Sequence, residues 1–209
     1  MYKYFKRILD FLISLVALII LSPIFLIIAI WIKTNSPGPV FFKQKRVGKN
    51  KALFEIYKFR SMRTDTPADM PTHLLNDPEA FITKSGHFLR KTSLDELPQL
   101  INIVKGEMAI IGPRPALWNQ YDLIEERYKY GANDVRPGLT GWAQINGRDE
   151  LEIPIKAKLD GDYVQNISFF FDVKCFFGTI TSVLRSDGVV EGGTGVIEKA
   201  KQDVKDDQE

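Results

Sequence analysis

Two adjacent carboxylates, Asp95 and Glu96, follow two cations, Arg90 and Lys91, in one short polar segment of the chain. A carboxylate at residue 95 can attack a phosphorus atom and form an aspartyl phosphate. Arg90, Lys91 and the start of a helix can hold the anionic substrate and its developing charge. Glu96 can help to hold Mg²⁺, which usually shares its coordination shell with water and phosphate oxygens. Neighbouring helical residues point about 100° apart, which favours separate roles for the two carboxylates.

The same segment also has a purely structural interpretation. Thr92 or Ser93 is a suitable N-cap for a helix that reaches about Ile103. An acid three residues further on, Asp95 or Glu96, would complete a capping box, and acids in a first helical turn offset the helix dipole. The residues alone leave the catalytic and the structural interpretations open.

Three further arginines lie beside turn-forming residues. Arg114 stands between Pro113 and Pro115, which restrict its backbone on both sides. A stiffly held guanidinium suits phosphate recognition, although a structural turn with an exposed arginine explains the pattern as well. Arg136 and Arg148 lie in glycine-rich stretches, where backbone N–H groups can approach a ligand closely. The sequence contains no GxxxxGK[ST] loop and no GxGxxG pattern, so the usual nucleotide-binding loops are absent.

A long apolar segment near the N-terminus could attach the chain to a membrane and so place the candidate site residues beside it. The 22 consecutive uncharged residues from Phe11 to Ile32 are long enough to cross a bilayer. Pro23 lacks an N–H and clashes with the carbonyl of Ile19, which predicts a kink. The Ser22 hydroxyl can donate to that carbonyl, which otherwise has no partner in hydrocarbon.

Positive charges on both sides of this segment bear on its topology. They are Lys3, Lys6 and Arg7 before it, and Lys33, Lys43, Lys45 and Arg46 after it. The positive-inside tendency would hold both ends on the cytoplasmic side. Each half of the segment reaches roughly half of the hydrocarbon thickness. We therefore predict a re-entrant helix-break-helix hairpin, with a single spanning helix as the alternative. The acid Asp10, near the start of the segment, can pair with Lys6 one turn earlier.

A second segment, residues 167–184, has apolar side chains at helical spacing and several phenylalanines. It predicts either an amphipathic helix at the membrane interface or an ordinary core helix. Between the two segments the patterns predict a small α/β (α+β) domain that is mainly helical. The predicted strands are 40–42, 53–59 and 108–111, with a turn at 47–51. The predicted helices are 92–103 and 117–128, with irregular polar or turn-rich stretches at 63–89 and 131–148.

Charge and cysteine usage limit the classes of function. Nine Lys or Arg lie between residues 33 and 63 against one acid, Glu55, although the net charge is only +2. Such a block suggests nucleotide phosphates or lipid headgroups, or simply a solvated loop, and no nucleic-acid partner is expected. Cys175 is the only cysteine, and His73 and His87 lack ligand spacing, so neither disulfides nor zinc are expected.

Several separated motifs together resemble the bacterial sugar transferase family, the monotopic phosphoglycosyl transferases. The resemblance extends from about residue 6 to residue 193. The matching stretches are Lys6-Arg7-x-x-Asp10, Ser22-Pro23, 42–46 (FKQKR), 57–62 (YKFRSM), 90–100 (RKTSLDELPQL), 112–115 (GPRP) and 136–148 (RPGLTGWAQINGR). In this family the Ser-Pro motif, here Ser22-Pro23, is the break between the two helical halves of a re-entrant membrane hairpin.

The resemblance implies a specific reaction. Asp95 would attack the β-phosphorus of a UDP-sugar and expel UMP, and polyprenyl phosphate would then take the sugar phosphate from the enzyme. Glu96 would assist, and Mg²⁺ would sit at the diphosphate with Asp95 and Glu96. The expected substrate-binding residues are Lys58, Arg60, Arg90, Arg114, Arg136, Gln144 and Arg148.

The resemblance also implies an organisation and a location. We expect a membrane hairpin over residues 1–34, a catalytic domain with interfacial amphipathic helices over 35–193, and a disordered polar tail over 194–209. The protein is expected at the cytoplasmic face of the bacterial inner membrane, in contact with lipid, and a homo-oligomer is compatible with this. The sugar is expected to be N-acetylated or a deoxy-amino sugar, with glucose and galactose still open. A glycosyltransferase that releases UDP and a non-catalytic membrane assembly module are the alternatives.

Overall fold

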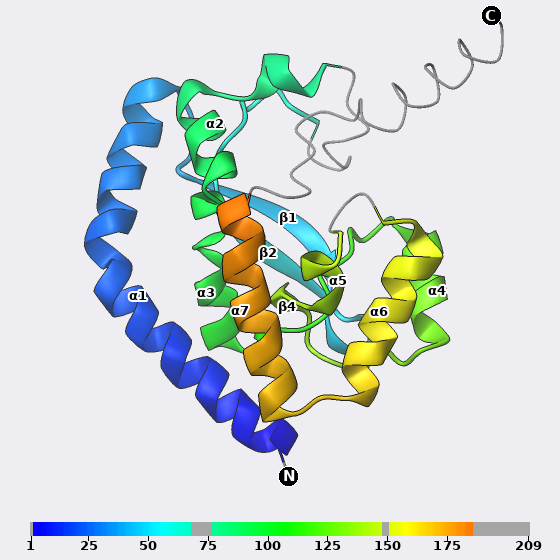
Figure 1. Ribbon diagram of the computed structural model, residues 1–209. Coiled ribbons are helices and arrows are strands. Elements are labelled where there is room, and N and C mark those ends of the chain that lie inside the picture. Colours follow the sequence, from blue (N-terminus) through cyan, green and yellow to red (C-terminus); the bar gives the residue numbers. More distant parts are fainter. Residues whose placement is uncertain (1, 68–76, 148–150, 186–209) are drawn as a thin grey trace, which may run out of the picture.

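The computed structural model describes residues 2–67, 77–147 and 151–185 (Figure 1). The α-helices are α1 (Tyr2–Asn35), α2 (Lys84–Lys91), α3 (Gln99–Lys105), α4 (Tyr121–Tyr128), α5 (Trp142–Ile145), α6 (Ile153–Gln165) and α7 (Phe169–Arg185). The strands are β1 (Phe41–Val47), β2 (Leu53–Phe59), β3 (Ala109–Ile111) and β4 (Gly138–Thr140), and the 3₁₀ turns are η1 (Lys49–Lys51), η3 (Pro78–Phe81) and η4 (Leu94–Glu96). This mixture of helices and short strands confirms the predicted fold class at that level.

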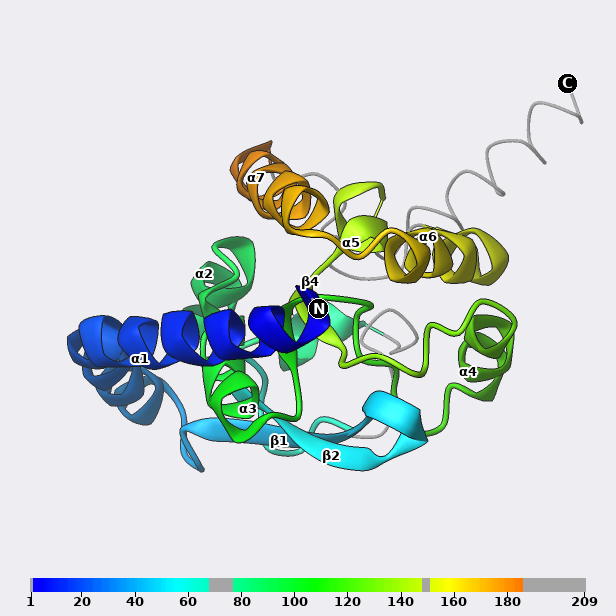
Figure 2. The same ribbon diagram turned by 90° about the horizontal axis from the view of Figure 1, so that it is seen from below.

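The strands form two small sheets. β1 and β2 pair antiparallel from Phe41 opposite Phe59 to Val47 opposite Leu53. The two strands and the turn between them were predicted, but β1 continues to Val47, beyond the predicted end at residue 42. β3 and β4 pair in parallel, and here a Cβ on Gly138 would lie 2.1 Å from the amide nitrogen of Gly112, so only glycine fits. Figure 2 shows the β1–β2 hairpin on one side of the molecule and α5, α6 and α7 on the other, with α3 and β4 between them.

Helix α1 curves around one side of the molecule and is helical from Tyr2 to Asn35, with Pro23 inside it (Figure 1). The Ser22 hydroxyl donates to the carbonyl of Ile19 at 2.8 Å, as predicted for the group that Pro23 displaces. The predicted break does not interrupt the helical conformation, so the re-entrant topology stays a prediction. α1 is also the one described helix that is long and apolar enough to cross a membrane.

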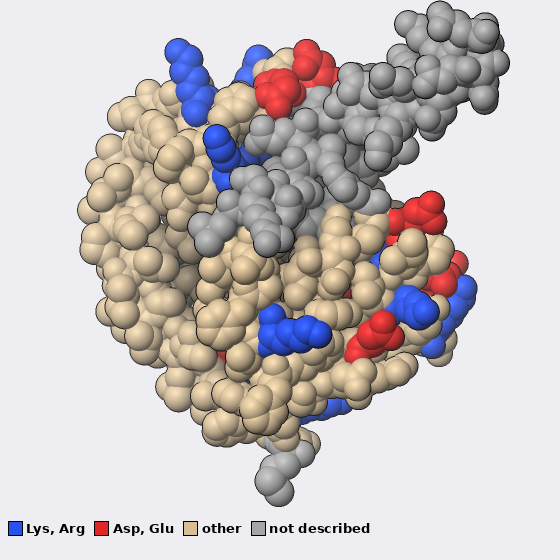
Figure 3. Space-filling view, in the orientation of Figure 1, with Lys and Arg blue, Asp and Glu red and all other residues tan. Residues whose placement is uncertain are grey.

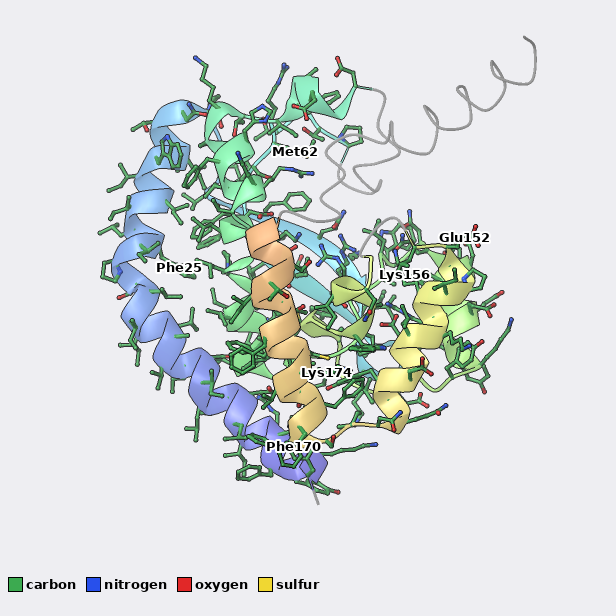
Figure 4. All side chains as sticks on the ribbon, viewed as in Figure 1. Phe25, Met62, Glu152, Lys156, Phe170 and Lys174 are labelled. Carbon is green, nitrogen blue, oxygen red and sulfur yellow. The ribbon has the colours of Figure 1, made fainter. Side chains whose placement is uncertain are left out.

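Both ends of α1 contact the rest of the domain. Near the N-terminus, the Arg7 guanidinium donates to the carbonyls of Ile103 at 2.7 Å and of Val104 at 3.1 Å, at the end of α3. Near the other end, Ile28 and Ile32 are buried in one hydrophobic cluster with residues from β2 and α2. Figure 4 shows Phe25 on the inner side of the helix, where its ring lies 5.0 Å from that of Phe59.

The predicted helix over residues 92–103 is wrong in its start. The chain first forms α2, whose N-cap Thr83 accepts a hydrogen bond from the amide of Gly86. It then turns at Ser93, which has φ +55° and makes no capping hydrogen bond, and passes through η4 into α3. The Thr92 hydroxyl donates backward to the carbonyl of Phe88 at 2.7 Å. The capping box is therefore absent, and Asp95 lies in a 3₁₀ turn.

Other differences concern elements that the sequence patterns did not reveal. η3 and most of α2 lie in the stretch 63–89 that was predicted to be irregular, and β4 and α5 lie in the turn-rich stretch 131–148. α4 begins at Tyr121, later than predicted, and the thirteen-residue helix α6 had no predicted counterpart. The predicted tail over 194–209 lies outside the described residues.

Helix α7 confirms the helix predicted over residues 167–184, and polar residues are among those that it buries. Asp172 and Cys175 are buried, whereas the exposed apolar side chains are Phe169, Phe170, Phe176, Phe177 and Ile180. Asp172 accepts hydrogen bonds from the hydroxyls of Tyr163 at 2.8 Å and Tyr2 at 2.6 Å. It also forms an ion pair with Lys6 at 2.9 Å, so α7 is tied to the start of α1.

Candidate active site

Asp95 and Glu96 lie together in η4, at the junction between α2 and α3. The left-handed conformation of Ser93 turns the chain between α2 and η4. Asp95 is only 7% exposed. Burial raises its pKa to about 6; the charges of Lys58, Arg90 and Arg114 oppose this shift, and that of Glu96 adds to it.

Glu96 is held by cations from two other parts of the chain. Its Oε1 accepts from the Nζ of Lys58, on β2, at 2.7 Å and from the Nη2 of Arg114, after β3, at 2.9 Å. Burial alone would raise the pKa of Glu96. The charges and hydrogen bonds of Arg114 and Lys58 outweigh burial and hold this pKa well below its usual range. The two neighbouring carboxylates therefore differ in proton affinity, as separate roles require.

Arg90, on α2, acts on Asp95 through its charge. Its positive charge is one of those that lower the pKa of Asp95. Its Nη1 lies 3.9 Å from the sulfur of Met62, a residue labelled in Figure 4. Its Nε is buried and has no hydrogen-bond partner among the described residues. A buried donor without a partner costs free energy unless a ligand supplies an acceptor.

Asn102 fixes the strand that carries Lys58, and no sequence pattern indicated this role. It is fully buried on α3, and its Oδ1 accepts from the amide of Tyr57 at 3.0 Å. Its Nδ2 donates to the carbonyl of Glu55 at 2.7 Å. The side chain thus replaces a neighbouring strand along this edge of β2 and sets the distance between Lys58 and η4.

Two predicted substrate-binding arginines have backbone partners in this structure. Arg60 is 4% exposed and donates to the carbonyls of Ser36 at 2.8 Å and of Pro37, just after α1. Arg136 donates from Nε to the carbonyl of Gly106 at 2.8 Å, at the end of α3. Arg148 lies outside the described residues. The structure therefore brings Lys58, Arg90 and Arg114 to the carboxylates, and it places Arg60 and Arg136 on backbone carbonyls.

Gln144, another predicted substrate contact, lies on α5 and is 7% exposed. Neither Oε1 nor Nε2 has a hydrogen-bond partner in the described part of the chain. A Cβ on Gly141 would lie 3.0 Å from this Oε1 and 2.0 Å from the carbonyl oxygen of Gly112. The amide therefore lies beside the loop that carries Arg114, with a donor and an acceptor that a ligand could satisfy.

Comparison with known proteins identifies the family of this chain. The family model described as bacterial sugar transferase matches residues 1–186. The sugar transferase EpsL of Bacillus subtilis is 41% identical over 184 residues, which cover 88% of this chain and 89% of EpsL. The exopolysaccharide production protein PSS of Rhizobium leguminosarum is 42% identical over 192 residues, covering 86% of this chain and 94% of that protein.

A third relative is longer than this chain. The UDP-glucose:undecaprenyl-phosphate glucose-1-phosphate transferase of Escherichia coli is 41% identical over 187 residues. These residues cover 85% of this chain but only 40% of the Escherichia coli protein. The family match extends over α1, the carboxylate pair and the cations around it. The chain therefore belongs to the bacterial sugar transferase family.

Proposed function

We propose that this protein transfers a sugar 1-phosphate from a UDP-sugar to undecaprenyl phosphate and releases UMP. The observation that carries this proposal is the buried Asp95 beside Glu96, with Lys58 and Arg114 holding the second carboxylate. Relatives named as undecaprenyl-phosphate transferases for glucose 1-phosphate and N-acetylgalactosamine phosphate support the acceptor and the reaction class. The names of other relatives point to exopolysaccharide synthesis.

In the first step, a carboxylate oxygen of Asp95 forms a bond to the β-phosphorus of the UDP-sugar. The bond from that phosphorus to the bridging oxygen breaks, and UMP leaves with this oxygen. In the second step, a phosphate oxygen of undecaprenyl phosphate attacks the same phosphorus. The bond to Asp95 breaks, which regenerates the carboxylate and yields the lipid diphosphate sugar.

The neighbouring residues stabilise the charge that develops on phosphorus-bound oxygens. Arg90 and Arg114 supply guanidinium groups that suit phosphate oxygens, and Gln144 supplies an amide beside the Arg114 loop. Glu96 holds Lys58 and Arg114 in place. Arg60 and Arg136 remain predicted substrate contacts, since an arginine can exchange a backbone partner for a phosphate when substrate arrives, and Arg148 stays a prediction as well.

The donor set also fits Mg²⁺. No group of three His, Cys, Asp or Glu side chains comes together in the described residues, so a cation would depend on oxygens from the substrate. Mg²⁺ commonly takes one or two carboxylates together with phosphate oxygens and water, and Asp95 and Glu96 are the residues that would hold it. When bound, it would neutralise charge on the diphosphate.

The position of α1 supports a protein attached to one face of the membrane. Contacts from Arg7 and from Ile32 bring both ends of this helix onto the same domain, as a hairpin in one leaflet requires. Figure 3 shows no charged side chains on the visible surface along the middle of α1. The exposed phenylalanines of α7, including Phe170 (Figure 4), would extend this contact along the interface on the cytoplasmic side.

Release of UMP is the test of the proposed reaction. Purified protein in nanodiscs is mixed with undecaprenyl phosphate, Mg²⁺ and each of several UDP-sugars, and both nucleotide products are measured. UMP release with one donor would support the proposal and identify the sugar. UDP release would instead indicate a glycosyltransferase, and no nucleotide release from any donor would favour a non-catalytic role.

The rate is expected to fall in acid because Asp95 must be ionised to attack. With its pKa raised to about 6, the carboxylate fraction falls as the pH drops through this value, and kcat/KM should fall with it. Lys58→Met removes a charge that lowers this pKa, so the decline should begin at higher pH. Because bound Mg²⁺ would lower the same pKa, the profile is measured from pH 5 to 8 at several Mg²⁺ concentrations. A rate independent of pH down to pH 5 at limiting Mg²⁺ would contradict this prediction.

A probe on α7 should report contact with lipid. The only cysteine, Cys175, is fully buried, so a fluorophore can be attached selectively to a new cysteine at Phe177, which is 60% exposed. We expect lipids with a shallow spin label to quench this fluorophore strongly. The matched control is the fluorophore at Tyr121 on α4, which is 62% exposed and should be quenched several-fold less. Equal quenching at both positions would argue against an interfacial α7.

A further inference from the structure

The loop that carries Arg114 is held almost entirely through its carbonyl groups. Pro113 and Pro115 have no N–H to donate. The carbonyl of Pro113 accepts from the amide of Gly138 at 2.8 Å. That of Pro115 accepts from the guanidinium of Arg46 at 3.0 Å. The carbonyl of Pro113 is therefore fixed from β4, and the carbonyl of Pro115 is fixed from β1.

Arg114 itself is held by a guanidinium from α4. The Nη1 of Arg127 donates to the carbonyl of Arg114 at 2.9 Å. The other side of the same guanidinium meets Asp160 on α6, with Nε at 2.8 Å and Nη2 at 2.6 Å from one carboxylate oxygen. Arg127 and Asp160 are 4% and 1% exposed. Asp160 thus orients the guanidinium, and the guanidinium orients the Arg114 carbonyl.

Stability alone is a poor explanation for this buried pair. Burial raises the pKa of Asp160 against the opposing charge of Arg127, and the second carboxylate oxygen of Asp160 has no hydrogen-bond partner among the described residues. Apolar residues of similar volume often replace a buried ion pair without loss of stability. The contact that an apolar pair could not reproduce is the hydrogen bond to the Arg114 carbonyl.

We propose that Arg127 and Asp160 are positioning residues for the transfer reaction, acting through Arg114; this rests on the proposed function. The order of contacts is short: Asp160 holds Arg127, Arg127 holds the carbonyl of Arg114, and the Arg114 side chain holds Glu96 beside Asp95. The flanking prolines limit how far the backbone of residue 114 can adjust. Neither Arg127 nor Asp160 touches the reacting atoms.

The expected kinetic effect follows from the proposed role of Arg114, which stabilises the charge that develops on the phosphorus-bound oxygens. A displacement of about 1 Å in a group that stabilises the transition state can cost about 100-fold in rate. Loss of the buried pair should therefore lower kcat about 10- to 100-fold while KM for the UDP-sugar changes less. A pair that only stabilised the fold would lower the melting temperature and leave the turnover of folded protein intact.

The test combines an apolar replacement with a double-mutant cycle. The variant Arg127→Met/Asp160→Leu is made in the wild type and in an Arg114→Met background, and kcat and KM are measured on folded protein. We expect the loss in the wild-type background to disappear in the Arg114→Met background, because the pair acts through that side chain. Equal losses in both backgrounds would overturn the proposal. Lys129→Met, which removes an exposed ion pair at the end of the same helix, should leave kcat unchanged.

Two further measurements keep the test decisive. If the apolar variant does not fold, Arg127→Lys and Asp160→Asn take its place, since each retains part of the hydrogen bonding. Their losses in kcat must likewise disappear in the Arg114→Met background. A crystal structure of the variant should show the Arg114 guanidinium displaced from Glu96, and an unchanged contact would overturn the proposal. UMP release by the wild type reports separately on the proposed function, because the displacement can be seen whatever reaction the protein catalyses.

Discussion

Replacing Asp95 by Asn is expected to lower the rate of UMP release by a factor on the order of 10⁴ or more, as is typical when an enzyme loses its nucleophile. An amide cannot form the bond to phosphorus, although it occupies nearly the same volume as the carboxylate. Because burial disfavours the charged form of Asp95, the neutral amide should fit the site without loss of thermal stability. The measurements are UMP release and the melting temperature.

The covalent step gives this prediction a second readout. Wild-type protein mixed with the UDP-sugar in the absence of undecaprenyl phosphate should gain the mass of one phosphorylated sugar, located at Asp95 by peptide mass spectrometry. Asp95→Asn should gain none. Asp122→Asn, at an exposed acid on α4, is the matched control and should keep full turnover and the adduct. Turnover by Asp95→Asn, or an adduct at another residue, would contradict the assigned nucleophile.

The parts of the fold that follow from short-range patterns were predictable. Strand β2 with the turn before it, the strand before Gly112, the helix α7 and the hydrogen bond from Ser22 to Ile19 each depend on residues close in sequence. The turn at η4 was not predictable, because Ser93 adopts a left-handed conformation that its residue type does not favour. Tertiary contacts determine that conformation, and they place Asp95 outside a regular helix.

The predicted site residues included both carboxylates together with Lys58, Arg90 and Arg114. The prediction did not include Asn102, Arg127 or Asp160, which help to position them. Asn102 reaches the backbone of β2 from 45 residues away, and Arg127 and Asp160 meet across 33 residues. Such contacts leave no periodic signal in a sequence. Conversely, arginine-rich motifs do not tell whether a guanidinium faces a ligand or the backbone, as Arg60 illustrates.

Replacing Arg114 by Met is expected to lower kcat by about 10²- to 10³-fold, the range typical for loss of one group that stabilises developing charge. The effect should be larger at low pH. Arg114 lowers the pKa of both Asp95 and Glu96, so its removal raises both, and at pH 6 a larger fraction of Asp95 carries a proton than in the wild type. At pH 8 Asp95 is ionised in either protein, and the loss there reports only on the missing guanidinium. The measurement is kcat for UMP release at both pH values.

Two substitutions separate charge from geometry at this position. Arg114→Lys keeps the positive charge, so the pH dependence should return towards that of the wild type. Its kcat should stay below the wild-type value because a lysine cannot form the planar, forked hydrogen bonds of a guanidinium. Arg63→Met removes an exposed arginine that pairs with Asp65 and should change neither quantity. If kcat of Arg114→Met fell by the same factor at pH 6 and pH 8, Arg114 would not control the ionisation of Asp95. If kcat did not fall at all, the contact between Arg114 and Glu96 would have no part in the reaction.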